Sequence, residues 1–171
     1  MNFEKKLRHV YDFPKEGIDF IDITTVIQDG EAFACLVDEM KERVEEFGEF
    51  DLITGSESRG FIFGTPLAYS LKKGFIPIRK KGKLPYKKIS VEYELEYGTD
   101  ILEMHEDAIK KGQRVVIVDD LLATGGTCES NIKLIEKLGG SVAGIMFFVE
   151  LTELKGIERF KDYNVISIVK I

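Results

Sequence analysis

The segment 114–127 constrains this chain most, because an apolar run is followed there by two adjacent acids and a turn of small residues. The run 115–118 contains only β-branched residues, which is typical of a parallel strand covered on both faces. Open α/β sheets bind ligands at the carboxyl ends of such strands, so we expect Asp119 and Asp120 at a ligand site. Apolar residues at helical spacing then predict a helix over 128–138.

The turn itself is Ala123-Thr124-Gly125-Gly126-Thr127. Small residues let backbone N–H groups converge, and the first turn of a helix adds unpaired N–H groups and a favourable dipole. These features favour a phosphate, and the neighbouring acids suit sugar hydroxyls. An ordinary strand-turn-helix with solvated acids is the alternative. Neither the Gly-x-Gly-x-x-Gly pattern nor a P-loop is present, which argues against nucleotides held in those ways.

A second segment, 54–60, reads Thr-Gly-Ser-Glu-Ser-Arg-Gly and lies between an expected strand and an expected helix. It can form a second nest of amides, with Arg59 supplying a charged fork for an anion such as diphosphate. Taken alone, the same residues also suit a turn that only caps the helix.

Charge and composition exclude several classes of function. The 24 Lys and Arg against 30 Asp and Glu give a formal charge of −6, which opposes a nucleic-acid partner. Cys35 and Cys128 lack metal-ligand spacing, so a reducing, cytoplasmic setting is expected. The longest apolar stretch, 145–149, is too short to cross a membrane.

Strand and helix patterns alternate along the 171 residues, which predicts one α/β domain with an open, mainly parallel twisted sheet flanked by helices. Segment 80–98 differs: five lysines precede an alternating stretch, which predicts an exposed β-ribbon that we interpret as a flexible lid. His105 is expected on the surface of a polar helix. The helices are expected over 31–47, 60–71, 100–111 and 128–138, and the other strands over 51–55, 75–79, 114–119, 141–150 and 164–169.

The adjacent acids followed by Thr-Gly-Gly-Thr resemble the phosphoribosyl diphosphate signature of the type I phosphoribosyltransferases. Further matches, in chain order, lie at 58–64, 79–85, 95–98 and 149–156, and they resemble the members of that family that act on adenine. The resemblance implies purine salvage, in which phosphoribosyl diphosphate and adenine give AMP and diphosphate. It also implies a homodimer, magnesium carried mainly by the substrate rather than by a protein metal site, and a cis peptide between Glu57 and Ser58.

The resemblance also assigns roles to residues. The acid pair would hold the ribose 2- and 3-hydroxyls, and the turn 123–127 would hold the 5-phosphate. The segment 1–30 would recognise the base. Two positions depart from the common pattern, since Ile21 stands where an arginine is frequent and Glu57 where an aspartate is frequent. The expected contacts are Glu57, Ser58, Arg59, Lys80 and Lys83 for diphosphate, and Phe20 and Ile21 for the base.

Transfer to N9 of adenine requires a group that accepts the N7 proton, and a carboxylate suits that task. Enzymes for 6-oxopurines resemble this chain but carry an acid at the place of Ala123, so here the acid must come from elsewhere. Glu96 in the lid is our candidate, with Tyr97 helping to seal the site and Arg59 stabilising the leaving diphosphate. A solvated edge of the ribbon is the alternative for Glu96.

Two other functions stay open at this point. The same fold could act on xanthine, a 6-oxopurine or a pyrimidine, although Ala123 argues against 6-oxopurines. The chain could instead be a regulator that senses phosphoribosyl diphosphate and binds nucleic acid or a partner protein. The net charge of −6 argues against this alternative.

Overall fold

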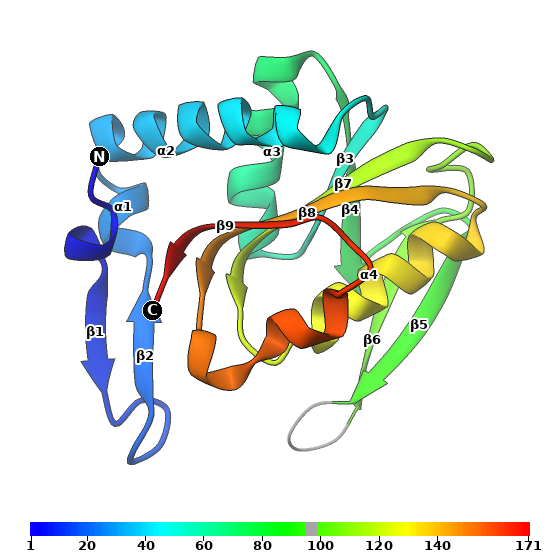
Figure 1. Ribbon diagram of the computed structural model, residues 1–171. Helices are drawn as coiled ribbons and strands as arrows, with labels where there is room; N and C mark the ends of the chain where they lie inside the picture. The colour runs from blue at the N-terminus through cyan, green and yellow to red at the C-terminus, as the bar shows by residue number, and fades with distance from the viewer. Residues whose placement is uncertain (95–98) are drawn as a thin grey trace. The chain divides into compact units, whose positions relative to one another are not determined.

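The computed structural model describes residues 1–94 and 99–171, so Glu96 and Tyr97 lie outside the described residues. The described chain divides into two compact units, 1–40 and 41–171, and each is described by itself (Figure 1). The expectation of a single domain stays a prediction.

The first unit contains an antiparallel hairpin followed by helices. Its strands β1 (Arg8–Tyr11) and β2 (Asp19–Asp22) pair Val10 with Phe20 and His9 with Ile21. The helix predicted over 31–47 is α2 (Gly30–Arg43), which crosses the boundary between the units. The 3-10 helix η2 (Val44–Phe47) that follows it belongs to the second unit. The hairpin is preceded by η1 (Glu4–Lys6) and followed by α1 (Thr24–Ile27).

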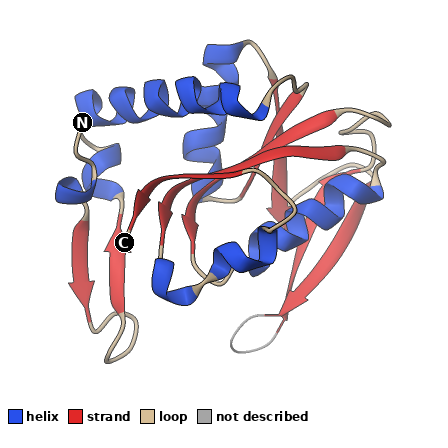
Figure 2. Cartoon of the chain, in the orientation of Figure 1, coloured by secondary structure: helices blue, strands red, loops and turns tan. Residues whose placement is uncertain are grey.

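A seven-stranded sheet forms the centre of the second unit, in the order β5-β6-β4-β3-β7-β8-β9 (Figure 2). Neighbours from β4 through β9 run parallel, whereas β5 and β6 are antiparallel additions at one edge. The expected α/β class with a mainly parallel sheet is thereby confirmed. The strands are β3 (Leu52–Ser56), β4 (Gly74–Lys80), β5 (Lys88–Glu94), β6 (Thr99–His105), β7 (Arg114–Leu122), β8 (Ser141–Glu150) and β9 (Val165–Lys170).

The connections of the sheet diverge between β3 and β7. Helix α3 (Arg59–Leu71) leads from β3 to β4, and α4 (Gly126–Lys137) leads from β7 to β8. Because β4 and β8 lie on opposite sides of the β3–β7 pair, right-handed crossovers place the two helices on opposite faces (Figure 1). Ligands of such sheets bind at the carboxyl ends of the strands where the connections diverge. The short helices η3 (Thr152–Leu154) and η4 (Gly156–Phe160) follow β8.

Strand β7 is buried over most of its length. All four side chains from Val115 to Val118 are 0% exposed, as predicted for a strand covered on both faces. The strand continues past its predicted end at Asp119, because β8 keeps pairing as far as Leu122 opposite Glu150. On the other side, pairing with β3 ends at Ile117. The two acids therefore lie where one of the two neighbouring strands has turned away.

The helix predicted over 100–111 is wrong, because residues 99–105 form β6. Leu, Glu and Met in this segment favour a helix, but seven residue pairs with β5 outweigh their propensity. Leu102 and Met104 join the core. His105 consequently lies on a strand and is half-buried, with its ring edge-on to Tyr86, so its expected place on a surface helix is also wrong.

The ribbon predicted within 80–98 is present in part as β5, which pairs with β6 outside that range, and it is exposed on one face only. Ile89, Val91 and Tyr93 belong to the core, which also includes residues of α4, whereas Lys88 and Glu92 on the opposite face are exposed. This alternation is that of a half-buried strand.

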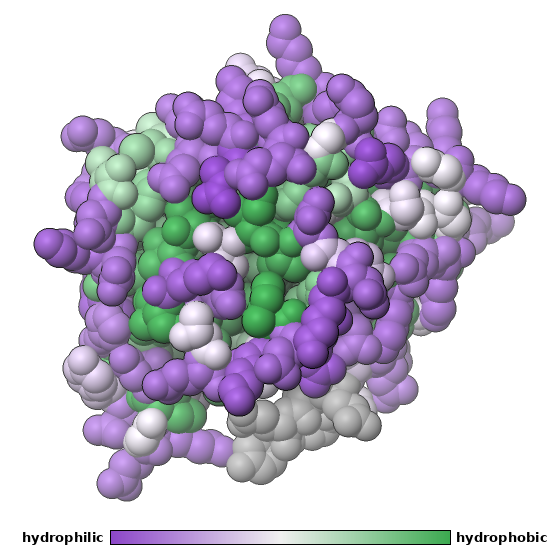
Figure 3. Space-filling model, viewed as in Figure 1, coloured by the Kyte–Doolittle hydropathy of each residue, from purple (hydrophilic) through white to green (hydrophobic). Residues whose placement is uncertain are grey.

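Hydrophilic side chains make up most of the surface in the view of Figure 3, with apolar side chains visible between them. None of the helices in the described ranges combines the length and the hydropathy that crossing a membrane requires.

Candidate active site

Two loops meet at the carboxyl ends of β3 and β7, and glycines allow their close approach. A Cβ atom on Gly55 would lie 2.8 Å from the carbonyl oxygen of Val118, and one on Gly60 would lie 3.1 Å from Oδ1 of Asp119. Any larger residue would push the loop 55–60, which we call the diphosphate loop after its expected ligand, away from the end of β7. The fold thus brings together the two anion-binding segments that the sequence predicted.

The adjacent aspartates of β7 are almost fully buried, at 8% exposed for Asp119 and 5% for Asp120. Oδ1 of Asp119 accepts the backbone N–H of Asp120 at 2.9 Å, and Oδ2 of Asp120 lies 3.0 Å from Nε of Arg59. Burial raises the pKa of Asp119 well above its ordinary value, and the charge of Asp120 raises it further. Burial also raises the pKa of Asp120, although Arg59 opposes that shift. Such a pair favours ligands that bring hydrogen-bond donors or positive charge.

Residues 123–127, which we call the phosphate loop after its expected ligand, lead directly into α4. Gly125 has a φ of 86°, in the region that favours glycine, and the first intrahelical bond runs from the Glu129 N–H to the Gly125 carbonyl at 3.0 Å. The helix begins at Gly126, two residues earlier than predicted, so Gly126 and Thr127 present first-turn N–H groups. A cavity of about 260 Å³ is lined by Asp119 and by residues 123–128.

The helix η4 braces the phosphate loop from the other side. A Cβ atom on Gly156 would overlap the carbonyl oxygen of Ala123, so the two backbones are in direct contact. The buried ring of Phe160 would lie 3.0 Å from a Cβ on Gly125. No role was predicted for Gly156, although it ends one of the matched segments.

The diphosphate loop is anchored to the end of β4. The peptide between Glu57 and Ser58 is cis, as the resemblance implied. The Glu57 carboxylate accepts Nε–H of Arg79 at 3.0 Å and the backbone N–H of Lys80 at 2.9 Å, while its own N–H donates to Ile78 at 2.9 Å. Glu57 therefore secures the loop, and direct contact of this residue with a ligand stays a prediction. Ser58 and Arg59 are exposed beside it.

Lys80 and Lys83 flank a turn between β4 and the ribbon. Nζ of Lys80 lies 3.2 Å from Oδ2 of Asp100, whose hydrogen bond and charge raise the lysine pKa. Buried Glu103 accepts the Gly82 N–H at 2.9 Å and so fixes the turn, while Lys83 is exposed. Neither acid was predicted at the site, because the segment that carries them was expected to be a helix.

The residues expected to contact the base lie in the first unit. Phe20 and Ile21 are neighbours on β2, and the Phe20 ring meets Phe13 edge-on at 5.2 Å. Their contact with a base, like the roles of Glu96 and Tyr97, stays a prediction.

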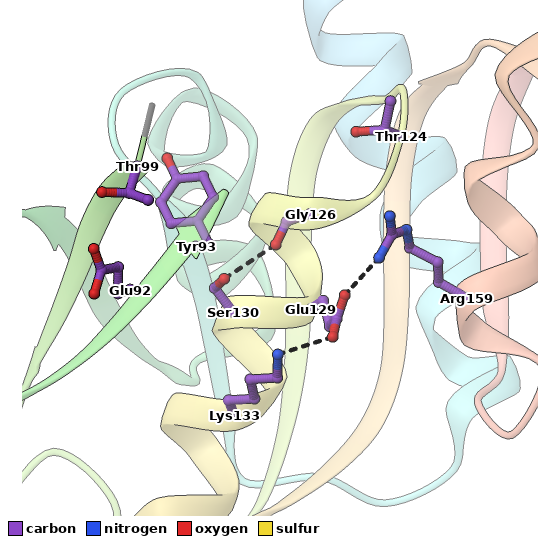
Figure 4. A pocket seen from close by; sticks show the side chains of 9 residues that line it. All are labelled: Glu92, Tyr93, Thr99, Thr124, Gly126, Glu129, Ser130, Lys133 and Arg159. Atoms are coloured by element: carbon purple, nitrogen blue, oxygen red, sulfur yellow. Dashed lines mark hydrogen bonds and ion pairs between the residues drawn. The ribbon is translucent and has the colours of Figure 1, made fainter. Parts of the chain in front are cut away.

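A larger cavity of about 650 Å³ lies along the outer side of α4 and extends to the ribbon (Figure 4). Its two cations, Lys133 and Arg159, each lie 2.8 Å from the carboxylate of Glu129. The smaller cavity is lined by all five residues of the phosphate loop, whereas the larger one is lined by only Thr124 and Gly126 among them, so the smaller cavity matches the predicted phosphate site better. Tyr93 lines both cavities.

Neither a cluster of metal ligands nor an ionised thiol marks this site among the described residues. Within residues 1–94 and 99–171, no group of three or more His, Cys, Asp or Glu side chains is placed to hold a metal ion. Cys128 is buried in the core, and burial, followed by the charge of Asp119, raises the pKa of its thiol well above the ordinary value. Cys35 is half-buried.

Replacing Gly156 by alanine should displace the phosphate loop, because the new methyl group would overlap the Ala123 carbonyl oxygen. We expect the affinity for ribose 5-phosphate to fall roughly tenfold or more, as misplacement of a binding group by an ångström commonly does. Calorimetric titration measures it. Gly30→Ala is the control, since a methyl group there would meet no atom of the described chain within 4 Å. Equal affinities for Gly156→Ala and the wild type would contradict the bracing role.

Replacing Asp119 by asparagine should stabilise the protein at pH 7 while weakening sugar binding. The raised pKa means that the folded state disfavours the ionised Asp119 carboxylate. The resulting loss of folding stability is absent below pH 3.8, the ordinary pKa, and it grows as the pH rises toward the pKa of Asp119 in the folded protein. We expect a gain of about 1 kcal/mol at neutral pH that disappears in acid. Denaturant unfolding across this pH range tests it, with exposed Asp107→Asn as the control. A variant less stable than the wild type at pH 7 would refute the expectation.

Comparison with known proteins agrees with this geometry. The sequence profile of the phosphoribosyl transferase domain matches residues 24–171. The adenine phosphoribosyltransferase of Acetivibrio thermocellus is 74% identical over 170 residues, covering 99% of both chains. The crystal structure of adenine phosphoribosyltransferase from Thermoanaerobacter pseudethanolicus superposes with a TM-score of 0.93 at 54% identity, covering 98% of this chain and 97% of that one. The Saccharomyces cerevisiae enzyme, complexed with adenine and an imino-altritol bisphosphate, gives a TM-score of 0.92 at 39% identity, with 96% and 95% covered. The chain belongs to the phosphoribosyltransferase family, among the adenine phosphoribosyltransferases.

Proposed function

We propose that this protein transfers the 5-phosphoribosyl group of phosphoribosyl diphosphate to adenine in purine salvage, giving AMP and diphosphate. A bond forms between N9 of adenine and C1 of the ribose, while the bond from C1 to the diphosphate oxygen breaks. The observation that carries the proposal is the meeting of a phosphate loop, a buried acid pair and a second anion loop at one end of the sheet. The adenine complex of the yeast relative supports the choice of base.

In this proposal the ribose 5-phosphate lies over β7 and the start of α4. Asp119 and Asp120 accept hydrogen bonds from the 2- and 3-hydroxyls, which supply the donors that buried carboxylates favour. The N–H groups and side chains of residues 123–127 hold the 5-phosphate at the helix N-terminus. The acid pair also lies close to the positive charge that develops on the ribose as the leaving group departs.

The diphosphate is held by the diphosphate loop and by the turn after β4. Arg59 is the catalytic cation, since it already lies beside the acid pair and can pass from Asp120 to the departing charge. Lys80 makes a similar exchange from Asp100, with Ser58 and Lys83 as further donors and Glu57 fixing the loop. Magnesium arrives bound to phosphoribosyl diphosphate and neutralises part of its charge.

Adenine is placed by the segment 1–30, with Phe20 stacking on the ring and the Ile21 position contributing backbone contacts. Glu96 accepts the N7 proton as N9 attacks, and the lid 80–98, with Tyr97, covers the reacting groups. Ala123 offers no carboxylate for that proton, which favours adenine over 6-oxopurines.

Two further expectations belong to the same proposal. The resemblance implies a homodimer, and the cysteine pattern favours a cytoplasmic setting. Sedimentation velocity on the purified protein measures the oligomeric state. A monomer at all concentrations would remove the dimer from the proposal and leave the reaction untouched.

The nucleobase specificity tests the function directly. Purified protein with phosphoribosyl diphosphate and magnesium should consume adenine and release AMP, and it should leave hypoxanthine, guanine, xanthine and uracil unchanged. Chromatography of the products measures this. Turnover of a 6-oxopurine without turnover of adenine would overturn the base assignment. Nucleic-acid binding without any turnover would favour the regulator.

Replacing Glu96 by glutamine should lower kcat far more than it weakens binding of phosphoribosyl diphosphate. General acid–base catalysis contributes roughly 10²–10⁴-fold, so a loss of about that size is expected. Steady-state kinetics gives both constants. Glu92→Gln is the matched control, because Glu92 lies on the exposed face of the same ribbon. Unchanged turnover in Glu96→Gln would remove that residue from the role.

A further inference from the structure

Tyr93 lies where the ribbon faces the phosphate loop. It points toward the core side of β5 and pairs across the ribbon with Asp100. Its side chain lines the small cavity together with Asp119 and residues 123–128, and it also lines the larger cavity beside α4. Figure 4 shows its ring opposite the first turn of α4. The ring therefore forms a wall of the cavity in which the proposed function places the 5-phosphate.

The hydroxyl of Tyr93 is only weakly engaged by its neighbour Asp100. It lies 3.4 Å from Oδ2 of Asp100, near the upper limit for a hydrogen bond. That carboxylate has stronger partners, because Oδ1 accepts the Ile101 N–H at 2.8 Å and Oδ2 lies 3.2 Å from Nζ of Lys80. Thr127 of the phosphate loop lines the same small cavity as Tyr93. The Tyr93 hydroxyl can turn from Asp100 to a ligand on the loop at little cost.

The protonation state of this hydroxyl suits a donor. Burial raises the pKa of Tyr93, and the negative charge of Asp100 raises it further, although Lys80 and Thr127 act in the opposite direction. The phenol therefore keeps its proton at neutral pH and can donate to a phosphate oxygen.

We propose that Tyr93 is a further substrate-binding residue, whose hydroxyl donates a hydrogen bond to the 5-phosphate from the ribbon side of the phosphate loop. The assignment rests on the proposed function and adds a contact from outside residues 123–127. The loop and α4 hold the phosphate from one side, and Tyr93 contacts an oxygen that faces the ribbon. Lys133 and Arg159, the nearby cations, line the larger cavity and are not among the residues that line the smaller one.

The test compares Tyr93→Phe with the wild type by calorimetric titration of AMP, adenosine and diphosphate. The substitution keeps the ring in the core and removes only the hydroxyl. We expect AMP to bind about tenfold more weakly, the loss of one hydrogen bond to a charged group, while adenosine and diphosphate bind unchanged. In kinetics the KM for phosphoribosyl diphosphate should rise, with kcat changed much less.

Tyr163→Phe is the matched control, because Tyr163 also packs on the core and its hydroxyl donates to Glu136 at 3.2 Å. Its affinity for AMP should equal that of the wild type. Equal weakening of AMP and adenosine in Tyr93→Phe would mean a packing role and would overturn the assignment, as would unchanged AMP binding. Wild-type protein that bound neither AMP nor diphosphate would overturn the proposed function, and the assignment with it.

Discussion

The burial of two adjacent carboxylates at the end of β7 is the constraint on which the rest of the site depends. Burying charge is costly, and the pKa of each aspartate is raised for that reason. Two features make the arrangement tolerable: Arg59 lies 3.0 Å from Asp120, and β3 has turned away so that ligands can reach the pair. A sugar that offers hydroxyl donors relieves the same cost, so the burial of these carboxylates favours binding.

Close backbone contacts hold the two anion loops around this acid pair. Gly55 and Gly60 let the diphosphate loop lie on the end of β7, and Gly156 lets η4 lie against the phosphate loop. Buried side chains add a direct link, since Ser56 at the end of β3 exchanges hydrogen bonds with Asn131 of α4 at 2.8 and 3.0 Å. The loops are thus placed by contacts with β7, α4 and η4, which reduces the ordering required when a ligand binds.

The cations around the site are held by carboxylates of the protein itself. Arg59 lies beside Asp120, Lys80 beside Asp100, and Arg79 beside Glu57. A partly exposed ion pair such as that of Lys80 with Asp100 is worth little on its own, so an incoming diphosphate can replace the carboxylate at a small cost. Asp120 is buried, so in the proposed complex the ribose hydroxyls must take the place of Arg59 beside it. The proposed contact of Tyr93 is a similar exchange, because its hydroxyl would leave a long hydrogen bond to the Asp100 carboxylate and donate to a phosphate oxygen instead.

The residues of segment 114–127 were sufficient to predict a buried parallel strand, two acids at its carboxyl end and a glycine-rich turn before a helix. The tendencies of β-branched, acidic and small residues act over a few neighbouring positions and do not depend on contacts with distant segments. The two anion loops, α3 and the start of β8 were predictable for the same reason. Contacts across the fold were needed to establish that residues 99–105 form a strand, since pairing with β5 outweighs their helix propensity, and that β7 continues to Leu122. Asp100, Tyr93 and Gly156 could not be assigned to the site beforehand, because their roles come from contacts between segments far apart in the chain, and a single sequence carries no record of such contacts.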